Sequence, residues 1–365
     1  MGIRMSTGAS KFGASEKLTE RFLRKSRKRE ALALEATDDE LLAQNPDRIC
    51  SNGSNTMASL YTKQGRKGVN QDAMILWEGF CSMEETVFCG VFDGHGPNGH
   101  LVARRVRDSL PSRLACELQE LFSSYCAEAK PMTISNDSII SLEISETNGR
   151  KEPEMFTLWR DSFLKACIVM EKELRVHPSI DCSYSGTTAV TIFKQGRHLV
   201  IGNVGDSRAI LGTKAENGTL VAVQLTVDLK PNLPQEAERI KQCKGRVLAM
   251  RDEPNVHRMW MPDNNSPGLA MARAFGDLCF KEFGLIAVPD IFYRFLTYTD
   301  QFIVLATDGI WEVLSNAEVV DIVSRAPSRA TAARHLVRSA VRSWRLKRSL
   351  SRADDCAAIC LFLDA

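Results

Sequence analysis

The sequence lacks the features of membrane-spanning, secreted and zinc-binding proteins. No segment of its 365 residues approaches the roughly 18 apolar residues that a membrane helix needs. The N-terminus is polar and basic, without the apolar stretch of a secretory signal. No Cys-x-x-Cys pair occurs among the 11 cysteines, and the six histidines do not stand at ligand spacing from a cysteine pair. A zinc site is therefore not expected.

The cysteines and the net charge also bear on location and partners. The number of cysteines is odd, and several lie within apolar runs, for example Cys89 and Cys360. Such positions are typical of buried reduced thiols, which persist in a reducing compartment.

The formal net charge is only +2, so no nucleic-acid partner is expected. We therefore expect a cytoplasmic or nuclear protein, and a monomer.

Residues 1–54 differ in composition from the rest and predict a flexible basic arm. They contain the basic run Arg24–Arg29, then the acidic Asp38–Glu40, and few aromatic residues. The basic run has two interpretations, a nuclear-import signal or a solvated charged tail. Met1–Ser6 also fits the loose N-myristoylation pattern, although one acyl chain binds membranes only marginally.

Residues 55–365 predict one α+β domain. Apolar strands are expected at 73–77, 86–92, 185–193, 198–204, 208–211, 302–306 and 356–363. Helices are expected at 98–129 with a break or kink at Pro111, at 156–176, 235–242 and 329–347, and after the capping box Ser315–Glu318. Links as short as Gln195-Gly196 and Gly205-Asp206 permit only antiparallel hairpins. The polar residues 130–153 are expected to form a surface insertion loop.

Two apolar segments end in the same Asp-Gly pair. Val87–Phe92 leads into Asp93-Gly94, and Phe302–Thr307 leads into Asp308-Gly309. Taken singly, each pair is typical of a turn. The sequence of one pair alone therefore predicts no chemistry.

Further acidic residues at strand boundaries change this interpretation. Asp72 precedes one apolar run, and Asp354-Asp355 precedes the last one. Carboxylates that converge on one rim of a sheet repel each other unless a cation neutralises them. Hard oxygen ligands select Mg²⁺ or Mn²⁺, and two such ions can hold a water as hydroxide and clamp a phosphoryl group.

Seven motifs occur in an order that resembles the protein phosphatase 2C family, the metal-dependent PPM phosphatases, and its plant members in particular. They are Gly68–Asp72, Val91–Gly96, Ser185–Ala189, Gly205–Ala209, Ala270–Asp277, Ala306–Trp311 and Asp354–Ala357. The resemblance runs from about residue 57 to the C-terminus. It implies a four-layer α/β/β/α sandwich with central antiparallel β-sheets and a site for two Mg²⁺ or Mn²⁺ ions at one end.

The resemblance implies a metal-binding role for particular residues. Asp93 matches the carboxylate that bridges both ions, and the carbonyl of Gly94 matches a further ligand. Asp308 and Asp354 match the remaining ligands of one ion, and Asp72 matches the acidic position at the other.

Four more residues receive roles in the same way. His95 resembles the general acid that protonates the leaving serine or threonine oxygen. Lys67 stands where the family places a cation that binds substrate phosphate. A lysine, unlike an arginine, cannot form two parallel hydrogen bonds to a phosphate. Asp206 and Glu312 fall where some members hold a third, weaker metal.

The sequence departs from the family pattern at three positions. Gln71 replaces a common glutamate, which lowers the charge at the second ion. Glu312 replaces an aspartate, and its longer side chain puts the third metal in doubt. Asp355 stands where an asparagine is common, so Asp355 is an alternative to Asp354 as the last ligand.

The resemblance implies hydrolysis of phosphoserine and phosphothreonine on phosphorylated proteins, by a metal-bridging hydroxide and without a covalent intermediate. A pseudophosphatase that keeps the fold without turnover is one alternative, and a hydrolase of small phosphoesters is another.

Residues 250–267 resemble the family's flap beside the active site. Trp260 within it is expected to pack the flap onto the domain rather than contact a partner.

Overall fold

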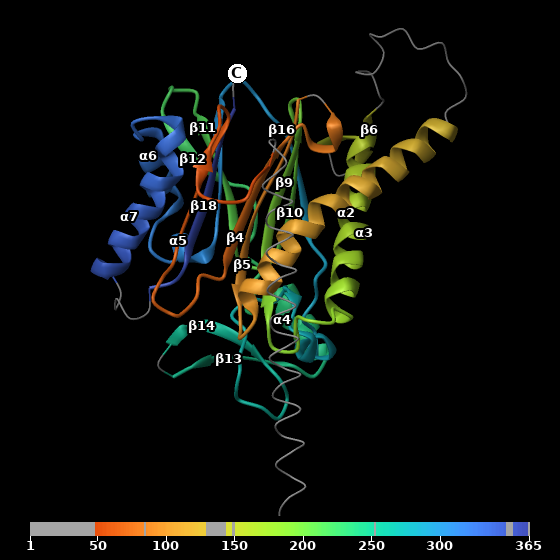
Figure 1. The fold of residues 1–365 in the computed structure, drawn as a ribbon, viewed down its shortest axis with the longest axis vertical. Coiled ribbons are helices and arrows are strands. Elements are labelled where there is room, and N and C mark those ends of the chain that lie inside the picture. Colours follow the sequence, from red (N-terminus) through yellow and green to blue (C-terminus); the bar gives the residue numbers. More distant parts are fainter. Residues whose placement is uncertain are drawn as a thin grey trace, which may run out of the picture. The chain divides into compact units, whose positions relative to one another are not determined.

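Two antiparallel sheets packed face to face form the centre of the molecule in this computed structural model, and helices cover the outer side of each (Figure 1). The structure describes residues 48–83, 85–128, 144–147, 150–251, 253–347 and 353–363. The predicted α+β sandwich of four layers is confirmed. The basic run Arg24–Arg29 and Met1–Ser6 lie outside the described residues.

The first sheet is built on six strands in the order β1–β4–β5–β9–β10–β16, and β8 and β15 extend it beside β5. Their bounds are β1 Arg48–Ile49, β4 Asp72–Glu78, β5 Thr86–His95, β8 Gly186–Thr187, β9 Ala189–Gln195, β10 His198–Val204, β15 Phe275–Gly276 and β16 Asp290–Phe295. The helices α2 (Gly99–Glu128) and α3 (Glu154–Arg175) cover its outer face, and a 3₁₀ turn, η1, spans Phe80–Ser82.

Alternation along β5 explains why the sheet is buried on both faces. Phe88 and Phe92 belong to the core under α2 and α3, whereas Val87, Cys89 and Val91 belong to the core between the sheets. Successive side chains of a strand point to opposite faces. A strand that is apolar at every position therefore fits only an inner layer of the sandwich.

The second sheet has the order β12–β11–β17–β18–β3–β2. Its strands are β2 Gly53–Ser54, β3 Ala58–Lys63, β11 Arg208–Lys214, β12 Leu220–Gln224, β17 Asp300–Ala306 and β18 Cys356–Phe362. The helices α6 (Asn316–Ser324) and α7 (Ala332–Lys347) cover it, and the short α5 (Asp308–Trp311) follows β17. The predicted capping box is confirmed, since Ser315 accepts from the backbone of Glu318 and the Glu318 side chain accepts in return.

The link between β10 and β11 differs from the prediction. We expected Gly205-Asp206 to join two strands of one hairpin, but β10 lies in the first sheet and β11 in the second. Gly205 has a φ of 103°, which a residue with a side chain rarely adopts. The chain therefore crosses between the sheets here, and Asp206 lies at the rim that the two sheets share.

Three further expectations need correction. Helix α2 runs through Pro111 without a break, because Pro111 is buried and its neighbours Leu110 and Leu114 pack in the core. Residues 130–153 are not one loop, since β6 (Ile144–Thr147) and β7 (Arg150–Pro153) pair as a hairpin, while 130–143 lie outside the described residues. Residues 48–54, expected in the arm, contribute β1 and β2 to the sheets.

The flap is a hairpin of β13 (Arg246–Met250) and β14 (Glu253–Trp260), which follows α4 (Pro234–Gln242). Trp260 is buried as expected, at 9% exposed, but its contacts lie within and beside the flap: its Nε1 donates to the carbonyl of Leu248 in β13 at 3.0 Å, and its ring lies against Gly268. Behind the flap, Arg273 binds the buried Glu236 of α4 and Asp290 at the start of β16. This ion-pair network holds α4 against the first sheet.

Among the helices that the structure describes, none is long and apolar enough to cross a membrane.

Candidate active site

Strand register brings the predicted aspartates together at one end of the sandwich. Asp72 opens β4 and lies directly opposite Asp93 of β5. In the second sheet, Ala306 at the end of β17 pairs with Ala358 near the start of β18, so Asp308 and Asp354 lie at the same edge. Antiparallel pairing thus converts strand-end positions that are far apart in sequence into neighbours. Each sheet supplies two of the four residues.

Thr307 links the two pairs across the sandwich. Its hydroxyl donates to Oδ2 of Asp72 at 2.9 Å and accepts from the backbone N–H of Ala357 at 3.0 Å. Asp72 belongs to the first sheet, whereas Ala357 belongs to the second. The sequence reasoning gave Thr307 no role, although a hydroxyl directly before a candidate ligand was a visible signal.

The four aspartates create a strongly unfavourable electrostatic environment for one another. Burial, and then the charges of Asp308, Asp72 and Asp354, raise the pKa of Asp93 well above its usual value. The pKa of Asp308 rises to about 6, and that of Asp354 also rises to about 6, chiefly because both groups are buried near other carboxylates. Proteins seldom gather buried carboxylates unless a cation offsets their repulsion.

This donor set fits hard divalent cations. All four candidate side chains offer carboxylate oxygens, the ligands that Mg²⁺ and Mn²⁺ prefer. Across the described ranges, no three His, Cys, Asp or Glu side chains already stand in a finished coordination geometry.

The contacts of Asp354 and Asp355 distinguish these two neighbours. The Asp355 carboxylate accepts the backbone N–H of Gly65 at 2.7 Å and that of Gln71 at 2.8 Å, so it holds the segment before β4 in place. Asp354 instead forms an ion pair with Lys67 and lies in the field of Asp308. This geometry favours Asp354 as the candidate ligand.

Gly94 occupies a position that no larger residue can share. A Cβ atom there would lie 2.4 Å from the carbonyl oxygen of Gly99 and 2.6 Å from that of Gln71. Its N–H donates to the same Gln71 carbonyl at 3.2 Å. The Gln71 side chain donates to the carbonyl of Gly96 at 2.8 Å, so it braces the turn that carries Asp93 and Gly94.

His95 is held by the last residue of the motif Ala270–Asp277, to which the sequence reasoning gave no role. Its Nε2 lies 2.5 Å from Oδ2 of Asp277, whose side chain is 1% exposed. Asp277 precedes the 3₁₀ helix η3 (Leu278–Phe283), and a Cβ on Gly186 would come within 2.0 Å of the same oxygen. Burial lowers the pKa of His95, but the charge and hydrogen bond of Asp277 outweigh it and leave the pKa raised.

Asp206 and Glu312 lie near Asp308. Both raise the pKa of Asp308 through their charge. Asp206 is buried, and the ammonium of Lys230 lies 3.6 Å from its Oδ2. Lys230 is a third residue, after Thr307 and Asp277, that the sequence reasoning missed, and its only signal was its position before Pro231.

The metal-free protein is expected to become less stable as the pH rises from about 4 to about 6. Asp308 and Asp354 have pKa values of about 6 in the folded state, against 3.8 ordinarily, so the folded protein binds more protons in this range. Thermal unfolding in EDTA at a series of pH values measures the trend. The unfolding midpoint should fall less steeply with pH in Asp308→Asn than in the wild-type protein. An equal pH dependence of the midpoint in the two proteins would contradict the expectation.

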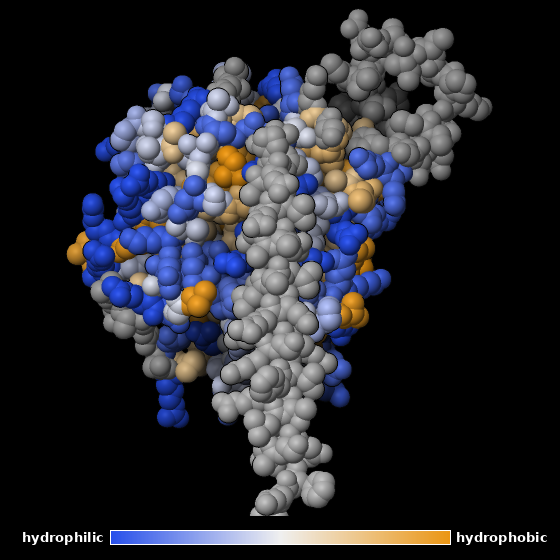
Figure 2. All heavy atoms as spheres, in the orientation of Figure 1, coloured by the Kyte–Doolittle hydropathy of each residue, from blue (hydrophilic) through white to orange (hydrophobic). Residues whose placement is uncertain are grey.

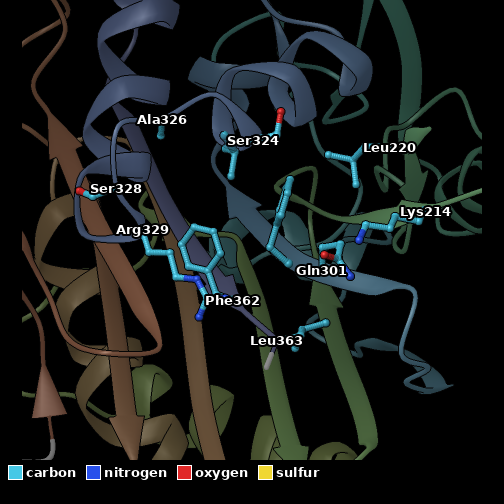
Figure 3. Close-up of a pocket in the computed structure, with 11 residues that line it drawn as sticks. Lys214, Leu220, Gln301, Ser324, Ala326, Ser328, Arg329, Phe362 and Leu363 are labelled. Atoms are coloured by element: carbon cyan, nitrogen blue, oxygen red, sulfur yellow. The ribbon is translucent and has the colours of Figure 1, made fainter. Parts of the chain in front are cut away.

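One pocket lies at the opposite end of the second sheet. It has a volume of about 320 Å³ and is lined in part by Gln301 at the start of β17 and Phe362 at the end of β18 (Figure 3). The candidate ligands lie at the other ends of these two strands. No residue predicted for the site lines this pocket.

Comparison with known proteins places these features in a family. Residues 61–345 match the family model described as protein phosphatase 2C. The chain is 55% identical over 350 residues to probable protein phosphatase 2C 33 of Arabidopsis thaliana, covering 90% of this chain and 71% of that protein. It is 57% identical over 329 residues to probable protein phosphatase 2C 14 of Oryza sativa subsp. japonica, covering 87% of this chain and 62% of that protein.

A solved structure is similar in fold. The crystal structure of serine-threonine phosphatase 2C from Toxoplasma gondii superposes with a TM-score of 0.72 at 24% identity, over 87% of this chain and 100% of that chain. At this identity the likeness concerns the fold alone.

Proposed function

This chain belongs to the protein phosphatase 2C family of metal-dependent serine/threonine phosphatases, and from that membership we propose that it hydrolyses phosphoserine and phosphothreonine in proteins. The chain spans 62–71% of the length of the two plant relatives described above. Its substrates and partners are therefore part of the proposal.

The observation that carries the proposal is the convergence of Asp72 and Asp93 from one sheet with Asp308 and Asp354 from the other. Asp93, together with the carbonyl of Gly94, would hold two Mg²⁺ or Mn²⁺ ions. When bound, the ions would lower the pKa of the attacking water and neutralise charge on the phosphoryl group. The contribution of the protein would be a shared rim to which each sheet brings carboxylate oxygens.

His95 would donate the proton that the leaving serine or threonine oxygen needs. Because Asp277 engages Nε2, Nδ1 is the nitrogen left to give a proton, and it has no hydrogen-bond partner among the described residues. Asp277 would hold the imidazole in orientation and favour its protonated form. An alkoxide leaves poorly, so this proton is needed for serine and threonine phosphates.

Lys67 would bind the substrate phosphate. Its ammonium pairs with Asp354, and its side chain is 57% exposed, so it can exchange a carboxylate for a phosphate oxygen that arrives from solvent. Asp206 and Glu312 would hold a third ion beside Asp308. In the present geometry the ammonium of Lys230 offsets the charge of Asp206.

The test is phosphate release from a phosphothreonine peptide by the purified protein. Treatment with EDTA is expected to abolish turnover, and Mn²⁺ or Mg²⁺ is expected to restore it. Turnover that a chelator leaves unchanged would contradict the metal-dependent mechanism.

Two further measurements address the alternatives. Calorimetric titration with Mn²⁺ that shows two sites without turnover would indicate a pseudophosphatase. A higher kcat/KM for nucleotides or sugar phosphates than for phosphopeptides would indicate a hydrolase of small phosphoesters.

A further inference from the structure

A row of four arginines runs along the exposed face of α7. Arg334, Arg338, Arg342 and Arg345 are all exposed, and the helix contains no aspartate or glutamate. Their spacing of four, four and three residues keeps the side chains on one face of the helix. The side of the molecule on which α6 and α7 lie is mostly hydrophilic (Figure 2). We call these four residues the arginine row.

The opposite face of α7 fixes the direction of the row. Leu336, Val337, Ala340 and Trp344 are buried in the core under the second sheet. The helix therefore cannot rotate to bury its arginines, nor can its apolar face insert into a lipid layer. The row is a permanent feature of the surface.

The C-terminal end of the row lies close to the candidate active site. Nε1 of Trp344 donates to the carbonyl of Gly309 at 2.7 Å, and Gly309 follows the candidate ligand Asp308. Arg345 is the next residue after Trp344. The row therefore leads from the rim of the site along the outside of the molecule for about 16 Å, at 1.5 Å per residue.

The four guanidinium groups have no ion-pair partner within the described part of the chain. The neighbouring helix α6 differs, because Asp321 pairs with Arg325, and Glu318 lies 3.7 Å from Lys347. Charges on α6 are thus balanced, whereas like charges four residues apart on α7 repel each other. The row is complementary to an anionic partner that the protein itself does not provide.

Geometry favours a narrow, extended partner over a broad one. Arginines four residues apart rise by about 6 Å along a helix. Side chains on one face of an extended peptide repeat about every 6.6 Å, so alternate acidic residues would follow the row. A flat anionic surface would also extend over α6, whose charges are balanced and offer it no net attraction. Arginine, unlike lysine, also offers paired N–H donors that match a carboxylate.

We propose that the arginine row binds an acidic extended segment of the phosphoprotein substrate and so guides the phosphorylated residue toward the site. The proposal rests on the proposed phosphatase function and adds a substrate class to it. The row contacts substrate away from the reacting atoms, so it acts on binding rather than on chemistry.

The experiment compares two phosphopeptides that share a phosphothreonine core. One carries a tail with glutamate at alternate positions, and the other carries glutamine instead. The wild-type protein is expected to prefer the glutamate peptide about tenfold in kcat/KM at low salt, through KM, as three exposed charge pairs allow. The triple variant Arg334→Gln, Arg338→Gln, Arg342→Gln should lose this preference and keep its activity on p-nitrophenyl phosphate.

A matched control removes the same charge elsewhere. Lys165, Lys172 and Arg175 are exposed on α3, which covers the other sheet, and their triple change to Gln should leave the preference intact. The proposal is overturned if the row variant keeps the preference or if the α3 variant loses it equally. It is also overturned if the row variant loses binding only to phosphatidylserine vesicles or to a single-stranded RNA.

Binding separates failure of this proposal from failure of the phosphatase function. If the full chain shows no turnover, fluorescence anisotropy still measures how tightly the unphosphorylated glutamate peptide binds to the wild-type protein and to the row variant. Binding that depends on the row supports the docking site even without catalysis, and binding equal in wild type and row variant overturns it.

Discussion

The Asp93→Asn protein is expected to hydrolyse a phosphothreonine peptide about a thousandfold more slowly than the wild type in the presence of Mn²⁺. Asp93 lies opposite Asp72 in the first sheet and in the field of both Asp308 and Asp354 of the second sheet. Asparagine keeps the size of the side chain but removes the charge. Steady-state turnover at saturating Mn²⁺ measures the effect.

The same substitution is expected to stabilise the metal-free protein. Burial and neighbouring carboxylates disfavour the charged form of Asp93, so removing that charge relieves repulsion in the folded state. Thermal unfolding in EDTA should show a higher midpoint for Asp93→Asn than for wild type. Asp161→Asn on the exposed surface of α3 serves as the control, with neither effect expected. A variant that loses both activity and stability would indicate a merely structural role.

The His95→Gln protein is expected to lose about a thousandfold in kcat on a phosphothreonine peptide, while its activity on p-nitrophenyl phosphate changes by less than about tenfold. A threonine alkoxide must be protonated as it leaves, whereas p-nitrophenolate is a weak base and leaves without a proton. Glutamine can still accept or donate a hydrogen bond at Asp277, which preserves the local structure. The ratio of the two activities is the measurement.

A second variant tests how His95 is held. Asp277→Asn keeps the shape of the contact with Nε2 but removes the charge that raises the pKa of the imidazole. The loss of kcat in Asp277→Asn should be smaller than in His95→Gln and should again affect the peptide more than p-nitrophenyl phosphate. In the plot of kcat against pH, the alkaline limb should move to lower pH. Equal losses on both substrates would show that His95 does not act as the proton donor.

Those parts of the site that lie at the ends of apolar strands could be predicted from the sequence. Asp93 and Asp308 each follow an apolar stretch, Val87–Phe92 and Phe302–Ala306, and the repulsion between carboxylates at strand ends indicated a shared cation site. Thr307 and Asp277 could not be found in this way. Their roles depend on contacts with Asp72 and His95, which lie more than a hundred residues away in the sequence.

The errors in the fold have a similar cause. A proline costs about 3 kcal/mol inside a helix, yet α2 continues through Pro111, because core packing on both sides outweighs a local preference. A tight link between two strands favours a hairpin, yet Gly205 carries the chain from one sheet to the other. In both cases tertiary packing, which no local pattern records, decides the outcome.

The position of β18 has a consequence for protein synthesis. This strand lies between β17 and β3, and the candidate ligand Asp354 directly precedes its start. A nascent chain that ends before residue 354 has an open gap in the middle of its second sheet, with unpaired edges that favour aggregation. A chain cut short before Asp354 is therefore expected to lack both a candidate ligand and the strand that joins β17 to β3, and to aggregate rather than fold.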